Sequence, residues 1–330
     1  MTSKSPRNKT LELSESEIQK NLEKCNSLKS EATVAQITNR VINQEMLEAL
    51  KYLPSDSIDL LLVDPPYNLT KQYGENKFAK VKFDEYEIWF EEWIVALKRC
   101  LKANASIYVC TDWESSKAVQ TVLEKHFKVR NRITWEREKG RGAKANWKNC
   151  SEDIWFATVS NDYHFDVDAV KLKRKVIAPY RDSEGAPKDW DETVDGNYRL
   201  TFPSNLWTDI TLPFWSMPEN TDHPTQKPEK LIAKLILASS REGDLVFDPF
   251  MGSGTTCVVS KKLKRNYLGI EKEPQYCAYA IERLKRAESN PSIQGYHDGY
   301  FWERNSLADQ KVPKKSAGQN NPVLENLFDE

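Results

Sequence analysis

Two short apolar runs, far apart in the sequence, each end in a loop that begins with Asp-Pro. Residues 58–63 lead into Asp64-Pro65-Pro66-Tyr67, and residues 245–247 lead into Asp248-Pro249-Phe250-Met251-Gly252-Ser253-Gly254-Thr255-Thr256. Short apolar runs bounded by Pro and Gly predict buried strands that end at these loops. The sequence therefore predicts a sheet that presents two strand-end loops of different chemistry.

Strand and helix patterns alternate on both sides of a polar middle region. Buried strands are expected at residues 105–110, 133–135 and 267–271. The helical spacing of apolar residues predicts helices at residues 46–50, 90–101, 119–123, 231–236 and 276–286. Because such alternation implies a mostly parallel sheet with helices on both faces, the expected fold class is α/β.

The alternation stops near Glu136, and this break suggests how the chain is divided. Residues 137–222 are rich in Lys, Arg, Asn, Asp, Pro and Trp, which favours an insertion carrying recognition loops over further sheet core. It would separate a catalytic half, residues 36–136, from a cofactor-binding half, residues 223–289. Residues 1–35 and 290–330 are expected to form a polar N-terminal arm and a polar C-terminal tail.

Composition narrows the class of protein and its compartment. No apolar stretch approaches the ~20 residues that a membrane span needs, and no secretory signal follows Met1. The six cysteines lie far apart without a Cys-x-x-Cys pair, which predicts reduced thiols in the cytoplasm and no zinc or other metal site. The formal net charge is −1, so any surface that attracts nucleic acid must be local.

The first loop has the groups that methylation of an exocyclic amine requires. The nitrogen lone pair of adenine or cytosine is delocalised into the ring, so the nitrogen is a poor nucleophile. The Asp64 carboxylate and the Pro65 carbonyl can accept its hydrogens and localise that lone pair, while Pro66 keeps the loop rigid. Tyr67 can stack on the base. Read alone, the tetrapeptide could still be a simple turn after a strand.

The second loop suggests a nucleotide-type cofactor. No Gly-Lys-Ser/Thr follows Gly252-Ser253-Gly254, so it is not a phosphate-binding loop, and the third glycine of the dinucleotide fingerprint is missing. Glu271 ends the next predicted strand, where an acid can bind the hydroxyls of a ribose. The loop therefore favours an adenosine-containing cofactor without a pyrophosphate.

Together these motifs resemble the β class of S-adenosylmethionine-dependent DNA amino-methyltransferases. In that class the Asp-Pro-Pro-Tyr segment precedes the recognition region and the glycine loop comes last, which is the order found here. The similarity covers roughly residues 42–286 and includes His223-Pro224-Thr225-Gln226-Lys227-Pro228, a loop of the family upstream of the cofactor strand. It implies a Rossmann-like fold with circularly permuted motif order and an inserted target-recognition region.

The resemblance also implies roles for individual residues. The catalytic residues would be Asp64, Pro65, Pro66 and Tyr67. Asp248, Phe250, Gly252 and Gly254 would line the methionine end of S-adenosylmethionine, Glu271 would bind its ribose, and Thr225 and Lys227 would flank the pocket. Pro249, Ser253 and Thr255 belong to the same loop. Residues 43–46 depart from the family's Gly-Asp pattern, so Glu45 and Met46 are the least specific of the cofactor predictions. The place of His223 in the family loop favours a positional role for its side chain over acid–base catalysis.

The expected activity is site-specific methylation of adenine N6 in double-stranded DNA by base flipping. Asp in the first position of the tetrapeptide favours adenine, by resemblance alone. N4-cytosine methylation is the nearest alternative, followed by methylation of protein glutamine or RNA, and by a DNA-binding regulator that has lost catalysis. A separately encoded restriction endonuclease and a homodimer are left open as partners.

A basic segment is the first candidate for DNA contact. Eight Lys and Arg lie between residues 128 and 148 against two Glu, with Gly and Trp interleaved. A solvated surface is the ordinary reading of such a run, but the mixture is typical of a loop that touches phosphates and bases. The predicted contacts are Arg132, Trp135, Lys139, Arg141 and Lys144. Lys171, Lys173, Arg174, Lys175 and Arg181 form a second candidate patch.

Overall fold

A sheet of eight strands forms the centre of the protein. The computed structural model describes residues 5–73, 76–137, 146–176, 180–193, 196–304 and 306. In spatial order the strands are β1 (Arg40–Asn43), β13 (Asn266–Glu271), β12 (Leu245–Asp248), β2 (Ile58–Val63), β5 (Leu101–Thr111), β7 (Ser151–Thr158), β6 (Lys128–Glu136) and β11 (Leu206–Trp207). The first five are parallel neighbours, β7 is antiparallel to both β5 and β6, and β11 is parallel to β6.

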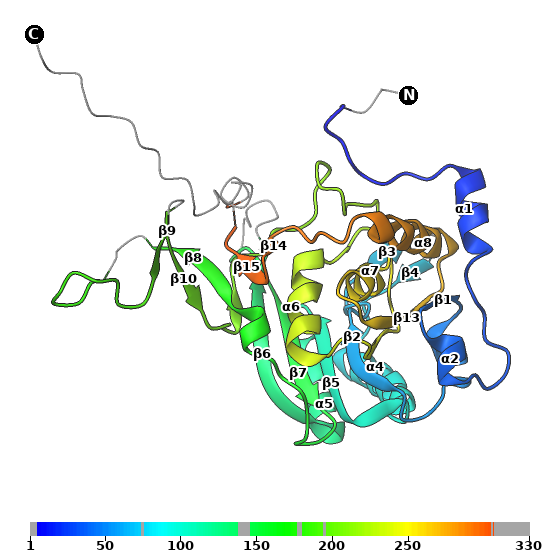
Figure 1. Ribbon diagram of the computed structural model, residues 1–330. Coiled ribbons are helices and arrows are strands. Elements are labelled where there is room, and N and C mark those ends of the chain that lie inside the picture. The colour runs from blue at the N-terminus through cyan, green and yellow to red at the C-terminus, as the bar shows by residue number, and fades with distance from the viewer. Residues whose placement is uncertain are drawn as a thin grey trace, which may run out of the picture.

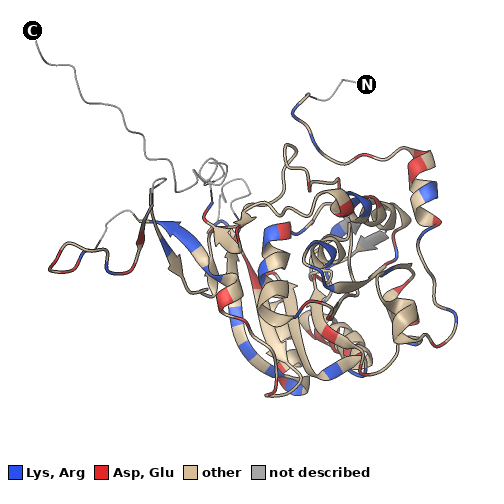
Figure 2. Ribbon diagram, in the orientation of Figure 1, with Lys and Arg blue, Asp and Glu red and all other residues tan. Residues whose placement is uncertain are grey.

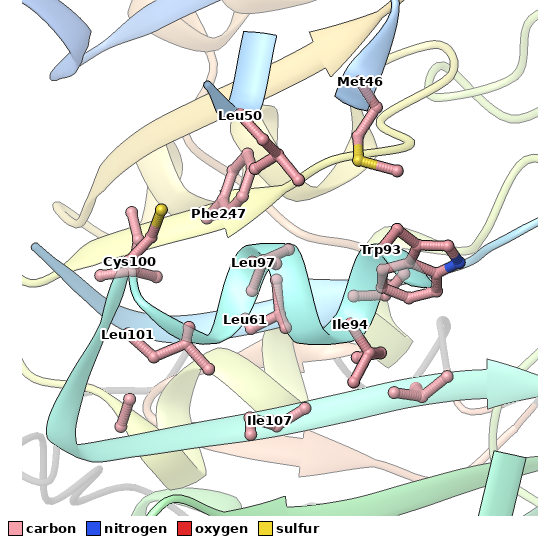
Figure 3. Close-up of a cluster of buried hydrophobic side chains, with 14 of the residues drawn as sticks. Met46, Leu50, Leu61, Trp93, Ile94, Leu97, Cys100, Leu101, Ile107 and Phe247 are labelled. Carbon is pink, nitrogen blue, oxygen red and sulfur yellow. The ribbon is translucent and has the colours of Figure 1, made fainter. Parts of the chain in front are cut away.

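Helices cover both faces because alternate residues of each strand point to opposite sides. In β2, Leu61 and Val63 pack in one core with α3 (Met46–Leu50), α4 (Phe83–Lys98) and α5 (Ser116–His126). Figure 3 shows this core, with Leu97 of α4 near Leu61. Leu60 and Leu62 belong to a second core with α6 (Glu229–Ser239). The expected parallel sheet with helices on both faces is confirmed.

Two further helices cover the cofactor half on the α6 side of the sheet. They are α7 (Thr255–Lys262) and α8 (Pro274–Ser289), which pack on each other and on β13. Within the described part of the chain, no helix is long and apolar enough to cross a membrane.

A second, smaller sheet projects from the main one on the left of Figure 1. Its strands lie in the order β14 (Tyr296–His297), β15 (Tyr300–Trp302), β8 (Leu172–Lys175), β10 (Gly196–Thr201) and β9 (Asp191–Thr193). The short 3-10 helix η1 (Asp168–Val170) and Leu172 share the apolar core of α6, so α6 connects the two sheets. A hairpin of β3 (Lys71–Tyr73) and β4 (Asn76–Phe78) follows the first Asp-Pro loop.

The structure corrects where the predicted insertion begins and ends. Strand β7, residues 151–158, lies inside the main sheet, and β11, residues 206–207, forms its edge. Residues 137–222 are therefore not an insertion separate from the sheet. The chain leaves the main sheet after Thr158 and returns at Leu206, so the excursion between the two strands is shorter than the sequence suggested.

The C-terminal segment is also more ordered than a polar tail. Phe301 of β15 lies opposite Leu172 of β8 and is fully buried, and Trp302 is buried beside it. Polar residues around this short apolar stretch, Tyr300-Phe301-Trp302, concealed it in the sequence. The described chain continues to Arg304 and Ser306, and the rest of the predicted tail lies outside the described residues.

The N-terminal arm packs against the cofactor half. Helix α1 (Glu15–Leu22) contacts α8, and α2 (Val34–Ile37) precedes β1. Leu11 is buried against Tyr276 and Tyr279 of α8. The backbone N–H of Lys9 donates to Trp215 O at 2.6 Å and that of Leu11 donates to Asn220 O at 2.8 Å. Residues 9–11 therefore lie across the loop that precedes the predicted cofactor strand.

Candidate active site

The two Asp-Pro loops come together at one edge of the main sheet. Strands β2 and β12 are neighbours, with Leu60 opposite Val246, so their loops leave the sheet side by side. Between these loops lies a cavity of about 290 Å³. Most of its lining comes from residues 64–67 after β2, 248–253 after β12, 271–273 after β13, 44–46 after β1, and from residues 223 and 225–227.

The carboxylate of Asp64 has a partner on each oxygen. Asp64 Oδ1 accepts a hydrogen bond from the Tyr67 hydroxyl at 2.8 Å, and Oδ2 accepts one from Lys227 Nζ at 2.6 Å. The Tyr86 hydroxyl of α4 donates to Pro66 O at 3.1 Å and fixes the loop. The predicted catalytic residues therefore lie in a rigid loop, with Lys227 in direct contact with Asp64.

A buried acid on β7 joins this group, and the sequence analysis did not identify it. Glu152 Oε2 lies 3.4 Å from Lys227 Nζ and 3.3 Å from the Tyr67 hydroxyl, and Oε1 is bonded to the Arg137 guanidinium. Glu152 is at the catalytic edge because β7 runs antiparallel to β5, so its first residues meet the last residues of the parallel strands. Only the direction of the strand reveals this placement.

The surroundings of Tyr67 and Lys227 keep both side chains protonated. Burial, with the negative charges of Asp64 and Glu152, raises the pKa of the Tyr67 hydroxyl well above its usual value. Burial alone would lower the pKa of the Lys227 ammonium, but Asp64 and Glu152 outweigh it and raise that pKa. At neutral pH the site therefore presents a neutral phenol and a cation to Asp64.

The second loop is held by its own acid. Asp248 Oδ1 accepts from Phe250 N at 3.1 Å, and Oδ2 accepts from the Thr256 hydroxyl at 2.6 Å. Burial raises the pKa of Asp248 to about 7. Glu271 accepts Gly252 N at 3.0 Å and Glu273 N at 2.8 Å, and burial raises its pKa too. Both acids line the cavity and hold the glycine turn.

The two glycines of the turn have different surroundings. Gly252 has φ of 51° and lines the cavity, and a Cβ there would lie 2.7 Å from His223 Nε2. Gly254 has φ of 81°, precedes α7 and is not among the lining residues; a Cβ there would lie 2.5 Å from Ala280 Cβ. Gly254 therefore allows α7 and α8 to approach each other, and its place at the methionine end stays a prediction.

The other predicted cofactor residues lie around the same cavity. Pro249, Ser253, Thr255, Thr225, Lys227, Glu45 and Met46 all line the cavity. Ser253 and Thr255 are also fixed from behind, because Arg283 donates to Ser253 O at 2.8 Å and to the Thr255 hydroxyl at 3.0 Å. Glu45 caps α3 by accepting from Glu48 N at 3.1 Å.

His223 has the surroundings of a positioning residue. Burial lowers the pKa of its imidazole to about 4, so the ring is neutral near pH 7. Nδ1 accepts from Thr225 N at 3.3 Å, and the ring packs edge-on against Tyr276. It thus supports the glycine turn without carrying charge.

The cavity also has an aromatic wall, of which the sequence analysis predicted Phe250 but neither Phe78 nor Trp89. Phe78, Trp89 and Phe250 line it, and Phe250 lies with its ring centroid 5.3 Å from that of Trp93. Trp89 had only the helical pattern of α4 to suggest it. Flat aromatic faces of this kind suit a heterocyclic ring.

The predicted DNA contacts have three outcomes. The contact assigned to Trp135 is wrong: its ring is fully buried and Nε1 donates to Ile210 O at 3.2 Å. Arg132 points to the other side of β6, with its side chain 55% exposed and Nε 3.8 Å from Asp153 Oδ1. Lys139, Arg141 and Lys144 lie outside the described residues.

The second basic patch lies on the projecting sheet. Figure 2 shows blue residues along β8, where Lys173, Arg174 and Lys175 follow one another. Lys173 Nζ lies 4.5 Å from the ring centroid of Trp302 and 4.8 Å from that of Tyr198. Phe202 and Tyr180 are largely exposed nearby in sequence. Partly exposed Lys173 and Arg174 and exposed Lys175 therefore lie together on β8, with exposed Phe202 directly after β10.

Residues 58–282 match the family model of the N6 and N4 amino-methyltransferases, described as DNA methylase. The chain belongs to this family. The type II methyltransferase M.HpaI of Haemophilus parainfluenzae is 33% identical over 248 residues, 74% of each chain. The DNA adenine methyltransferase YhdJ of Escherichia coli K12 is 32% identical over 281 residues, covering 82% of this DNA methylase and 92% of YhdJ.

A solved structure supports the fold of this DNA methylase. The complex of M1.HpyAVI with S-adenosylmethionine aligns with a TM-score of 0.51 at 22% identity, over 74% of this chain and 98% of that one. The predicted Rossmann-like methyltransferase fold, family and enzymatic class are confirmed. The family uses S-adenosylmethionine, so the expected methyl donor is confirmed at the level of the family.

Proposed function

We propose that this DNA methylase transfers the methyl group of S-adenosylmethionine to N6 of adenine in duplex DNA, after the base has flipped out of the helix. The observation that carries the proposal is the shared cavity, in which Asp64 faces the glycine loop from a rigid Pro-Pro segment. The name of YhdJ as an adenine methyltransferase favours adenine over cytosine.

Methyl transfer to an exocyclic amine requires acceptors for the amino hydrogens, and the first loop contains two. The Asp64 carboxylate and the Pro65 carbonyl draw the amino hydrogens away from the ring plane and localise the nitrogen lone pair. No strong base is needed, because the nitrogen becomes acidic once it is methylated. Tyr67 lies beside Asp64 and orients the base, either through its ring or through its hydroxyl.

The second loop has the groups that would hold S-adenosylmethionine. Asp248 and Glu271 are acceptors suited to the amino group and ribose hydroxyls of the cofactor, and Trp89 offers a face for its adenine ring, with Phe250 toward the methionine end. Gly252, Ser253, Thr255 and Pro249 bring the backbone close to the methionine end, with Thr225 and Lys227 at the border of the cavity. When bound, the cofactor supplies the electrophilic methyl group.

We assign target recognition to the projecting sheet, with residues 159–205 and the C-terminal strands as its parts. Its cations are placed to contact phosphates, whereas Asp64 and the cofactor loop lie in the main sheet. The proposed compartment is the cytoplasm, where the six free cysteines would stay reduced. A separately encoded restriction endonuclease with the same recognition sequence is the proposed counterpart, and light scattering of the purified protein decides between monomer and homodimer.

Single-molecule sequencing of DNA from cells that express the protein, with Asp64→Ala as control, tests the activity. Methylated adenine N6 within one sequence context, absent from the control, is the expected result. If the modified position is cytosine N4 instead, cytosine and not adenine is the substrate. DNA that is bound but unmodified by the wild-type protein would favour a regulator without catalysis.

A further inference from the structure

Four charged side chains from four separate segments meet beside the first loop. They are Asp64 after β2, Arg137 after β6, Glu152 of β7 and Lys227 before α6. The side chains of Glu152 and Lys227 are 5% and 7% exposed. Such burial makes each charge dependent on its partners, because a buried ion without a counter-charge is strongly destabilised.

This arrangement sets a problem for the proposed reaction. Lys227 Nζ lies 2.6 Å from Asp64 Oδ2, and the Tyr67 hydroxyl lies 2.8 Å from Oδ1. Each Asp64 oxygen thus already accepts one hydrogen bond, and the short contact with Lys227 draws negative charge away from the carboxylate that should accept a hydrogen of the target amino group. Asp64 accepts the amino hydrogen more strongly if the ammonium moves away as the base binds, and a Lys227 that leaves Asp64 needs another carboxylate.

Glu152 is placed to be that carboxylate. Its Oε2 lies 3.4 Å from Lys227 Nζ, longer than the distance to Asp64 but already within ion-pair range. Arg137 is bonded to the other oxygen and fixes the carboxylate from the opposite side. A small movement of the ammonium toward Glu152 would free Asp64 without leaving Lys227 unpaired.

We propose that Glu152 is a positioning residue for methyl transfer, which takes over the Lys227 ammonium when the amino group of the flipped base binds Asp64. The inference rests on the proposed base methylation at Asp64 and goes beyond it, since it assigns a role to an acid outside both predicted loops. Tyr67 follows the same exchange, because its single hydroxyl hydrogen can go to Asp64 or to Glu152.

The test is the single-turnover methylation rate of Glu152→Gln on a duplex that contains the recognition sequence. The amide keeps the size of the side chain but removes its charge, so Lys227 stays on Asp64. We expect a rate about 10- to 100-fold lower, the factor that a hydrogen bond to a charged group contributes. The dissociation constant for S-adenosylmethionine should stay within about twofold of wild type.

The double variant Glu152→Gln/Lys227→Met separates this role from a structural one. If Lys227 blocks Asp64 in Glu152→Gln, removing the cation frees the carboxylate, and the double variant should be faster than Glu152→Gln alone. Two independent structural defects would instead make it slower. Glu152→Asp keeps the charge and should have an intermediate rate, which keeps the proposal testable if the amide variant does not fold.

Glu288→Gln is the matched control, because Glu288 also pairs with a lysine, Lys261, but on the exposed surface of α8. It should methylate at the wild-type rate. A wild-type rate for Glu152→Gln, or a double variant no faster than the single one, would overturn the role of Glu152. Failure of the proposed function is distinguishable, because the wild-type protein would then methylate no base.

Discussion

Charged side chains are buried and paired at the catalytic edge of the main sheet, whereas those on the projecting sheet are partly exposed. At the catalytic edge, Lys227 Nζ lies 2.6 Å from Asp64 and 3.4 Å from Glu152, and the three side chains are largely removed from water. On the projecting sheet, Lys173 lies over the ring of Trp302, and Arg174 lies 3.6 Å from the partly exposed Glu303. The first arrangement fixes geometry, and the second leaves cations available to a partner.

The difference predicts how each region responds to substitution. Removing one member of a buried pair leaves its partner unpaired, so effects should be large and insensitive to salt. Exposed pairs contribute about 0–1 kcal/mol and are screened by ions. Variants at the edge should therefore change chemistry or folding, whereas variants on the projecting sheet should change DNA affinity.

The largest expected effect is that of Asp64→Ala. Loss of one preorganised acceptor should lower turnover by about 10²–10³, while the affinity for S-adenosylmethionine changes far less. Methyl transfer from labelled cofactor measures the rate and calorimetry measures binding. Asp162→Ala, at an exposed position in the loop after β7, is the control. Turnover near that of wild type in Asp64→Ala would remove Asp64 from the mechanism.

Gly254→Ala should destabilise the fold at the same edge. Its Cβ would meet Ala280 Cβ at 2.5 Å in a backbone conformation of positive φ, which together should cost about 2–4 kcal/mol of unfolding free energy. Gly185→Ala has a similar φ of 84° with nothing within 4 Å, so it should show the strain alone. Urea unfolding compares the two. Ala280→Gly should restore part of the loss, and no recovery would argue against a helix contact.

Binding of S-adenosylmethionine should weaken as the pH falls below about 7. Burial holds the pKa of Asp248 near 7, so acid protonates the carboxylate that would bind the amino group of the cofactor. Affinity should fall up to about tenfold per pH unit below that value. Calorimetry between pH 8 and 6 measures this trend. Asp248→Asn should bind weakly at every pH, and an equally steep dependence in that variant would assign the titration to another group.

The smallest effect on catalysis is expected from Lys173→Ala/Arg174→Ala/Lys175→Ala on the projecting sheet. Each lost phosphate contact should reduce the slope of log affinity against log salt by about 0.9. The single-turnover rate at saturating DNA should stay near that of wild type. Lys20→Ala/Lys24→Ala/Lys285→Ala removes three exposed lysines in and around α1 and α8 as the control. An unchanged slope in the first variant would move the DNA contact to the segment around Arg132.

Local motifs were predictable from the sequence, and strand direction was not. Asp64 and Asp248 each follow an apolar run directly, so their loops could be read without knowing the fold. Glu152 precedes Ile154-Trp155-Phe156, and only the antiparallel course of β7 brings it to Asp64. A polar residue at the start of a short strand carries no signal of that neighbour.

The burial of Trp135 could have been predicted from the alternation of apolar and polar residues in its strand. In β6, Ile133 and Trp135 alternate with Arg132 and Thr134, so the strand period puts Trp135 on the buried face with Ile133. The basic composition of the segment suggested stacking on a base instead. Gly254 is similar, because a glycine turn indicates close approach but does not say whether a cofactor or a helix approaches.

The position of strand β15 determines which segments must be transferred together to give one enzyme the sequence specificity of another. The strand lies parallel beside β8, with fully buried Phe301 opposite Leu172, although more than a hundred residues separate them in the chain. A cassette of residues 159–205 transplanted alone would carry β8 to a host without its matching neighbour and expose Leu172. A functional chimaera needs two grafts, the central cassette and residues 293–304, taken from the same donor.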